Sequence, residues 1–463
     1  MKKIVASVGL VALGASSFYS TASAQGVIGP DTSKPWSVSA ALRGFYDDNI
    51  STIPNDTVLG PDQHRDVYGL EVSPAATLNW NVPQTTINLG AQYSYKQYDR
   101  TPIGSTDNHD QTFSFTGDLS HSFSEMFKAR VADSFVIGQE PDLIRAGNAF
   151  ATFQRLSGDN IRNYGSLSLD AQFTPRLGAS LGYDNAYYDY AGKGESVAPS
   201  GYFYASGPLA GQSVPGVAAS PAGALNRIEN RIHIEGLYSL GPETKGILGY
   251  NFTDVSFTGN ELIGGFLIDP AAGVTPANIV NPIYSKNRNY REHIVYLGAS
   301  HNFSPQMTGN IRAGASYTDY YNDSTQDPSY TPYVTADLKY TYGPESYVDV
   351  GFSYDRNATD VVGLLGSGGF TVDSEAAVVF ANVSHRFTPQ LFANVMAQFQ
   401  NSLYNGGIYD GQSEQYYLAG LDFEYRFAQY VSAHVGYNYD RLQSELGRTY
   451  DRNRVYIGVT ASY

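Results

Sequence analysis

The last nine residues, 455–463, constrain the fold more than any other stretch of the chain. They read Val-Tyr-Ile-Gly-Val-Thr-Ala-Ser-Tyr, so apolar side chains alternate with small or polar ones up to the final residue, Tyr463. Alternation with a period of two predicts a β-strand with one apolar face. Because chain termini usually fray, a strand that continues to the last residue needs a neighbouring strand to hold it. An ordinary edge strand and the closing strand of a barrel both fit this stretch.

The same alternation recurs along the whole chain, between short turns. Six turns are centred on proline, and two more without proline fall in step with them: 81–84, 173–176, 240–243, 303–306, 342–345, 387–390, and then 123–126 and 427–430. Proline presets φ for a tight turn and ends the pairing of the strand before it. Eight hairpins give sixteen strands, and the segments 36–46 and 455–463 bring the total to eighteen.

The remaining connections are long, as at 138–158, 191–226 and 259–286. An even number of alternating strands with short turns on one side and long loops on the other is typical of outer-membrane barrels. No stretch approaches 18 consecutive apolar residues, which excludes a membrane-spanning helix. We therefore predict an all-β fold: a single transmembrane antiparallel β-barrel of about 18 strands, with short periplasmic turns and long extracellular loops.

The N-terminus predicts export. Lys2 and Lys3 precede a short apolar core at 4–14, and Ala-Ser-Ala at 22–24 is a small-residue cleavage site. These features indicate a signal peptide over residues 1–24 and a single barrel domain over 25–463, in the outer membrane of a Gram-negative bacterium. The formal net charge of −15 argues against nucleic acid as a partner.

Several short features together resemble a known family. Asp-Asn-Ile at 48–50 ends an early strand, the turns are broken by proline, about eighteen strands are expected, and the C-terminus is aromatic. This combination resembles the putative β-barrel porin 2 family, some members of which are linked to exopolysaccharide export. In outer-membrane barrels the final aromatic residue serves the assembly machinery, which implies that role for Tyr463. The implied partners are outer-membrane lipid, lipopolysaccharide, the barrel assembly machinery and polysaccharide-export proteins.

Charged side chains fall on the strand face opposite the apolar one, and we predict that they line the lumen. They are Arg43, Glu71, Lys96, Asp118, Arg130, Asp170, Arg231, Glu235, Asp337, Lys339, Asp349, Asp422, Glu424, Arg426 and Arg454. A lumen lined in this way holds water. The pattern alone does not distinguish an open channel from a closed barrel, because charges must point away from lipid in both.

Two further sets of residues follow from the strand pattern. If 36–46 pairs with 455–463, Asp47 and Asp48 come near Arg452 and Arg454, and we expect exposed ion pairs at this seam. Strict alternation also turns four polar residues toward lipid. We interpret these four, Asp133, Asn163, Asn185 and Asn230, as marking bulges or positions above the membrane.

No motif for catalysis is present. The eight histidines are scattered without metal-ligand spacing, and no nucleophile elbow or phosphate-binding loop occurs. We predict no enzyme activity and no catalytic, cofactor or metal site. The expected function is passage of a polar solute, a saccharide or exopolysaccharide. A general small-solute porin and a structural or adhesive barrel closed by its loops remain alternatives. We expect the low-charge loops 191–226 and 259–286 to narrow the lumen.

The length asymmetry of the connections yields a test of orientation. An epitope tag placed within 191–226 should bind antibody on intact cells, whereas a tag at Gly241-Pro242 should bind only after the outer membrane is opened. The reverse labelling pattern would overturn the predicted orientation.

Overall fold

A computed structural model describes residues 34–139, 149–155, 160–192, 194, 196–203, 211–269, 276–323, 326–364 and 369–463. The predicted signal peptide, residues 1–24, lies outside this range. Most of the described chain is β-strand, with one short α-helix and three 3₁₀ turns. No helix in the described part of the chain has the length and apolar character needed to span a bilayer.

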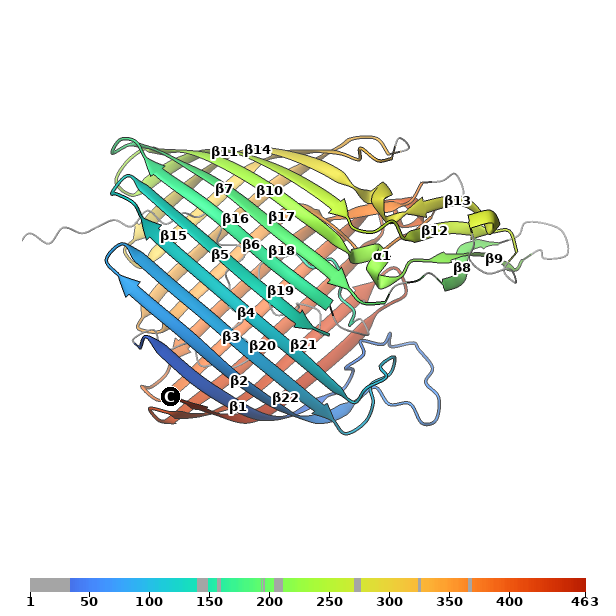
Figure 1. Cartoon of the computed structure of the whole chain (residues 1–463), viewed down its shortest axis with the longest axis horizontal. Coiled ribbons are helices and arrows are strands. Elements are labelled where there is room, and N and C mark those ends of the chain that lie inside the picture. The colour runs from blue at the N-terminus through green and yellow to red at the C-terminus, as the bar shows by residue number, and fades with distance from the viewer. Residues whose placement is uncertain are drawn as a thin grey trace, which may run out of the picture.

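Eighteen antiparallel strands form one closed sheet, which confirms the predicted fold (Figure 1). Each strand pairs with the next wall strand along the chain, and β1 pairs with β22 to close the barrel. The wall strands are β1 (Trp36–Asp47), β2 (Val67–Val82), β3 (Thr85–Tyr98), β4 (His109–Ser122), β5 (Phe127–Gly138), β6 (Asn160–Gln172), β7 (Leu177–Tyr190), β10 (Arg227–Ser239), β11 (Thr244–Phe257), β14 (Tyr290–Ser304), β15 (Met307–Asp319), β16 (Ser329–Gly343), β17 (Ser346–Asn357), β18 (Thr371–Arg386), β19 (Leu391–Gly406), β20 (Ser413–Ala428), β21 (Val431–Ser444) and β22 (Tyr450–Ser462).

All eight predicted turns fall at the short connections of the barrel. The Phe-Thr-Pro turns show why they are tight. At the turn after β6 the hydroxyl of Thr174 accepts a hydrogen bond from the backbone N–H of Leu177 at 3.0 Å, and Thr388 accepts one from Leu391 at 2.9 Å after β18. A hydroxyl that bonds its own backbone in this way favours a turn over continued strand pairing.

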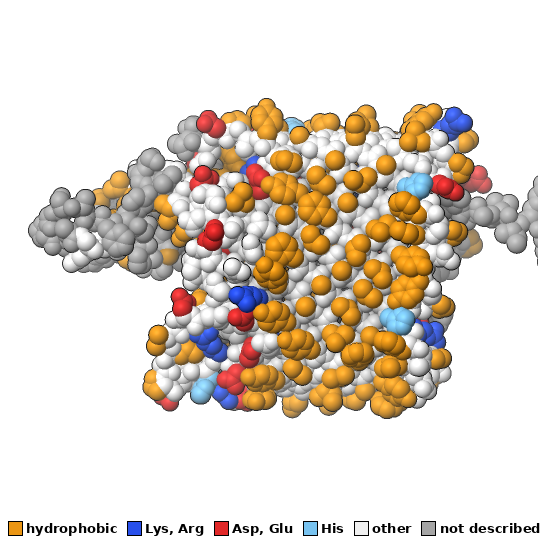
Figure 2. Space-filling view, turned by 180° about the vertical axis from the view of Figure 1, so that it is seen from behind, with side chains coloured by type: hydrophobic (Ala, Val, Ile, Leu, Met, Phe, Trp, Pro, Cys, Tyr) orange, Lys and Arg blue, Asp and Glu red, His pale blue; other side chains and the backbone are white. Residues whose placement is uncertain are grey.

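The outer surface of the barrel is apolar over its middle. Leu70 and Leu297, for example, are 60% and 67% exposed, as expected for side chains that face lipid. In the view from behind, hydrophobic side chains cover the centre of the wall, and most charged side chains lie toward its two ends (Figure 2). On the inner face, tyrosine rings lie over glycines. A Cβ at Gly436 would lie 2.1 Å from the ring of Tyr456, so only glycine fits there.

The two long low-charge loops do not lie in the lumen along their described strands. They form a second sheet, in the order β13-β12-β9-β8, that projects beyond the loop end of the barrel (Figure 1). Its strands are β8 (Ser196–Phe203), β9 (Ser213–Ala218), β12 (Leu262–Leu267) and β13 (Ile279–Tyr284), and α1 (Pro221–Leu225) follows β9. The expectation that both loops narrow the lumen is therefore wrong for these strands. Valine, leucine and isoleucine in β9, β12 and β13 favour pairing instead. The 3₁₀ turns are η4 (Pro276–Asn278), η5 (Ser285–Arg288) and η6 (Gly407–Tyr409).

The seam differs in detail from the sequence prediction. Asp47 pairs with Arg452 at 2.6 Å, and this ion pair is buried rather than exposed. Asp48 instead accepts hydrogen bonds from the backbone and the amide side chain of Asn453, both at 2.6 Å, while Arg454 pairs with Asp440 at 2.7 Å. The reason is the period of the strand. Consecutive residues point to opposite faces, so Asp47 and Asp48 cannot both meet the arginines on the inner face.

Of the two interpretations of the four lipid-facing polar residues, bulges and positions above the membrane, the first is wrong. The pairings β5–β6, β6–β7 and β7–β10 run without a register shift. Asp133, Asn163, Asn185 and Asn230 lie in regular strand with their side chains on the outer face.

Mutation of the buried Asp47–Arg452 pair should cost more stability than mutation of an exposed ion pair nearby. Replacing Asp47 by Ala removes the carboxylate from buried Arg452 and should lower the free energy of unfolding by about 3–5 kcal/mol. Arg441→Ala, which breaks an exposed pair with Asp451, should cost less than about 1 kcal/mol. Urea unfolding of the barrel in detergent micelles measures both. Equal costs for the two variants would contradict a seam fixed by the Asp47–Arg452 pair.

Candidate functional site

The candidate site is the inner wall of the barrel, where the predicted charged residues lie. Glu71, for example, is 6% exposed, whereas its neighbours on β2, Leu70 and Val72, face outward. The same alternation puts all fifteen predicted side chains on the inner face: Arg43, Glu71, Lys96, Asp118, Arg130, Asp170, Arg231, Glu235, Asp337, Lys339, Asp349, Asp422, Glu424, Arg426 and Arg454.

Many of these residues form ion pairs between adjacent or nearby strands. Arg43 lies 3.9 Å from Glu71, which also accepts hydrogen bonds from the hydroxyls of Ser73 and Ser94 at 2.9 and 2.6 Å. Lys96 is the register partner of Glu71 on β3. Positive and negative side chains therefore alternate around this part of the wall, so the local field is mixed rather than of one sign.

Other predicted residues are paired in the same way. The paired distances are 2.6 Å for Arg130 with Asp118, 2.9 Å for Arg426 with Glu424, and 2.8 Å for the amide of Asn310 with Asp337. Arg231 on β10 lies 4.0 Å from Asp355 on β17, five strands away around the barrel. This last contact bridges the lumen. The structure does not bring all fifteen residues into one site; they spread along the wall.

Two inner-wall groups combine a carboxylate with a tyrosine. Glu235 accepts hydrogen bonds from the hydroxyl of Tyr296 at 2.9 Å and from the guanidinium of Arg312 at 2.8 Å. Asp422 accepts a hydrogen bond from the hydroxyl of Tyr456 at 2.8 Å. Sequence analysis omitted Arg312, although its position between outward Ile311 and Ala313 on β15 is a sufficient signal.

Residues 149–155, in the connection between β5 and β6, cross the lumen. The backbone of Phe150 exchanges two hydrogen bonds with the side chain of Gln400, at 2.8 and 3.1 Å. Gln400 belongs to β19, eight strands from β5 in a barrel of eighteen, and so lies on the opposite wall. Phe153 stacks on Tyr416 with ring centroids 4.9 Å apart. We call residues 149–155 the crossing segment.

Charged side chains hold the crossing segment at two points. At its C-terminal end the guanidinium of Arg155 lies 2.6 Å from buried Asp110. In its middle the hydroxyl of Thr152 donates to Asp360 at 2.8 Å, and Asp360 in turn pairs with Arg448 at 2.9 Å. Arg448 also pairs with Glu414 at 2.6 Å. Burial disfavours the charge on Arg448, but Asp360 and Glu414 outweigh burial and raise the pKa of its guanidinium above the ordinary value.

A second buried arginine joins three separate connections at the loop end. Arg288, at the end of η5, donates to the backbone carbonyls of Ala224, Thr359 and Val372 at 3.0, 2.6 and 3.1 Å. Its guanidinium also lies 4.7 Å from the ring centre of Phe257. Burial lowers the pKa of Arg288 to about 10, so this residue remains charged at neutral pH.

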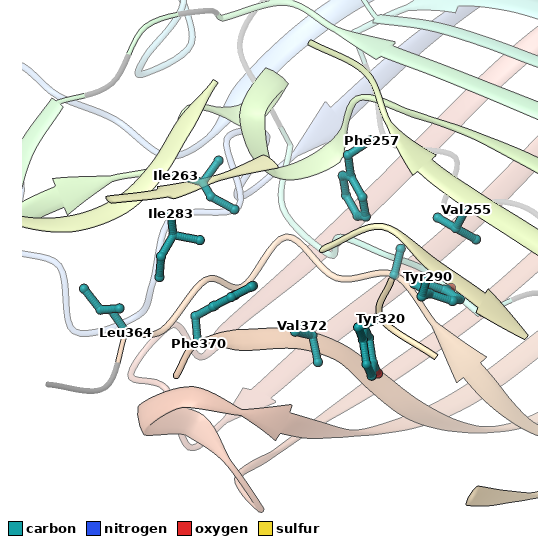
Figure 3. Close-up of a cluster of buried hydrophobic side chains, with 10 residues drawn as sticks. Val255, Phe257, Ile263, Ile283, Tyr290, Tyr320, Leu364, Phe370 and Val372 are labelled. Carbon is teal, nitrogen blue, oxygen red and sulfur yellow. The ribbon is translucent and has the colours of Figure 1, made fainter. Parts of the chain in front are cut away.

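An apolar cluster lies at the loop end of the barrel, and it includes Phe257, the ring that Arg288 contacts (Figure 3). It joins inner-face residues of the wall to residues of the loops and of the second sheet: Val255, Phe257, Ile263, Ile283, Tyr290, Tyr320, Ala358, Leu364, Phe370 and Val372. Sequence analysis missed Arg155, Arg288 and Arg448, because these loops have no periodicity from which a facing direction can be inferred. The described loops thus pack against one another and against the wall.

The comparisons with known proteins agree with the fold. The family model described as "Putative beta-barrel porin 2" matches residues 363–463, which confirms the resemblance over the C-terminal strands. No curated protein matches the chain.

The solved structures that match the chain have low sequence identity to it. OpdK of Pseudomonas aeruginosa, an outer membrane protein, is 11% identical over 92% of this chain and 99% of its own, with a TM-score of 0.43. OccAB4 of Acinetobacter baumannii is 12% identical over 93% and 99%, with a TM-score of 0.39. OccK2 (OpdF) of Pseudomonas aeruginosa in complex with glucuronate is 11% identical over 92% and 98%, with a TM-score of 0.40.

The contacts of Arg288 predict that this residue holds the loops together. In Arg288→Met the three carbonyls lose their donor, and each buried carbonyl left without a partner costs about 1–3 kcal/mol. Amide hydrogen exchange at 221–225 and 358–364 should accelerate at least tenfold, while exchange within β19 stays unchanged. Lys286→Met, an exposed residue of the same 3₁₀ turn, is the matched control. Unchanged exchange in the Arg288 variant would show that the loops do not depend on it.

Proposed function

We propose that this chain forms an outer-membrane channel for a polar solute, most simply a saccharide. The observation that carries the proposal is the inner wall. Its carboxylates, guanidinium groups and tyrosine hydroxyls run along the barrel between outward apolar residues. Barrels of about 16–18 strands are wide enough to enclose an aqueous path. A polar wall around such a path favours water and hydroxylated solutes over lipid.

The chemistry of one exposed wall pair suits a sugar. A hydroxyl of a saccharide can donate to a carboxylate such as Asp118 and accept from a guanidinium such as Arg130; these two side chains are 23% and 38% exposed and lie 2.6 Å apart. Glu235, Tyr296 and Arg312 bond to one another and are buried, so they shape the wall and do not contact a solute.

The crossing segment sets the width of the path in this proposal. Phe150 and Phe153 reach from the β5–β6 connection to the opposite wall, and they displace water from that part of the lumen. A solute must pass beside this segment or move it. The proposed partners are outer-membrane lipid, lipopolysaccharide, the barrel assembly machinery through Tyr463, and polysaccharide-export proteins if the solute is an exopolysaccharide.

A second candidate function is a structural or adhesive barrel closed by its loops. The apolar cluster that Arg288 contacts and the sheet that projects beyond the barrel favour it, because both fill or extend the loop end. A general small-solute porin would share the channel but show no preference for saccharides.

Uptake into liposomes distinguishes these candidates. Liposomes that contain the intact protein should take up a neutral disaccharide slowly but faster than protein-free liposomes. The double variant Phe150→Ala, Phe153→Ala should raise the rate severalfold, because it removes the side chains that fill the crossing point.

Phe303→Ala, which changes an exposed ring at a turn, is the matched control and should not alter uptake. Equal rates for the disaccharide and for a non-sugar solute of similar size would favour the general porin. If neither the parent nor the double variant passes the disaccharide or ions, the barrel is structural and the channel proposal fails.

A further inference from the structure

A strip of polar side chains crosses the outer face of four adjacent strands. It consists of Asp133 on β5, Asn163 on β6, Asn185 on β7 and Asn230 on β10, and we call it the outer polar strip. Asp133 and Asn185 are both register partners of Gly165, and Asn185 is the register partner of Asn230. The four side chains are half-buried and therefore still accessible from outside the barrel.

The strip lies toward the loop-side edge of the apolar band, with at least one further apolar or aromatic outward residue on its loop side on each strand. Along β5, β7 and β10 the outward positions next to the strip carry apolar or aromatic residues: Val131 and Phe135, Tyr183 and Tyr187, Ile228 and Ile232. Along β6 they are Ile161 and Gly165, with Leu167 as the next outward residue. Lipid tails offer no hydrogen-bond partner to groups at this depth. Polar side chains in this position are costly, and such residues usually face protein or water.

Hydrogen bonds among the side chains of the strip satisfy only some of their donors and acceptors. The amide of Asn163 donates to the carboxylate of Asp133 at 2.9 and 3.1 Å. The amide of Asn185 donates to Asn230 Oδ1 at 2.9 Å, and the Tyr183 hydroxyl donates to the same oxygen at 2.7 Å. Among the described residues, Asn163 Oδ1 and Asn185 Oδ1 accept no hydrogen bond, and Asn230 Nδ2 donates none. One donor and two acceptors thus remain on one lipid-facing patch.

The geometry points to a second copy of this chain as the partner of the strip. Asn163 is the tenth residue from the turn-side end of β6, and Asn230 is the tenth from the turn-side end of β10, so the two lie at a similar height on the barrel. Asn185 lies between them, ninth from the turn-side end of β7. A two-fold axis parallel to the barrel axis, passing close to Asn185, brings Asn230 of each copy opposite Asn163 of the other. In this arrangement Asn230 Nδ2 of each copy can donate to Asn163 Oδ1 of the other copy, so the same hydrogen bond forms twice.

A lipid headgroup does not fit the same observations. Headgroups lie at the membrane surface, whereas the strip is flanked by apolar residues toward both ends of the barrel. Phosphate groups are anionic, and the charged member of the strip is the carboxylate of Asp133. Side-chain amides, in contrast, carry both a donor and an acceptor and can pair with their own kind across a symmetric interface.

Cross-linking in membranes tests the homodimer. The chain contains no native cysteine, so a single introduced thiol can be cross-linked without background. With a short bismaleimide, the Asn185→Cys variant should give mainly a dimer band. Val435→Cys, an outward position on β21 that is 48% exposed, should remain monomeric at the same expression level. Adding Asn163→Leu and Asn230→Leu to the Asn185→Cys chain should reduce its dimer band at least fivefold.

The mass of the particle gives an independent readout. Native mass spectrometry from detergent should show a dimer for the parent and a monomer for the Asn163→Leu, Asn230→Leu variant, with the folded barrel intact in both. A parent that is monomeric, with or without bound lipid, would overturn the proposal. Equal cross-linking of Asn185→Cys and Val435→Cys would overturn it too, because that result reflects collision and not a specific face.

Discussion

The pairing of β1 with β22 is the constraint on which the rest of the structure depends. A sheet inside a bilayer has no water to satisfy the N–H and C=O groups of a free edge, so the only stable arrangement of these strands is a closed one. Closure joins residues near the two ends of the described chain, and the final hydrogen bonds run between Val38 and Tyr463 at 3.1 and 2.8 Å. The buried Asp47–Arg452 pair lies at the other end of the same seam. Once the sheet is closed, every strand has one face toward lipid and one toward the lumen.

The outer face of the closed sheet contacts lipid and the inner face lines the lumen, so the two faces carry different side chains. Outside, apolar residues cover the middle of the wall; inside, carboxylates pair with guanidinium groups and accept from tyrosine hydroxyls. The loops add a third environment at one end. There Arg288 and Arg448 are buried, the first bonded to backbone carbonyls and the second to two carboxylates. Both residues tie together segments that are distant in sequence, so the loop end is a packed structure and not a set of independent loops.

The wall could be predicted from sequence because one simple period governs it. Alternation identified the strands, the proline turns fixed their ends, and both together gave the number of strands. The same rule, applied residue by residue, would also have separated Asp47 from Asp48 and added Arg312 to the inner face. The loops could not be predicted in this way. Nothing in the residues around Phe150 or Arg288 indicates a partner on the opposite wall, because those contacts depend on which strands closure brings face to face. The outer polar strip was visible in the sequence, but its regular geometry became clear only from the strand register.

The central claim is that water reaches the inner wall and does not reach the outer one. Thr335 and Ala336 are consecutive residues of β16 that point to opposite faces, and each can be replaced by cysteine in a chain that has none. The direct measurement is the reaction of each thiol with a charged, membrane-impermeant reagent in intact vesicles. The account predicts rapid reaction for Thr335→Cys and none for Ala336→Cys. An unreactive Thr335→Cys thiol would contradict a water-filled lumen and, with it, a channel.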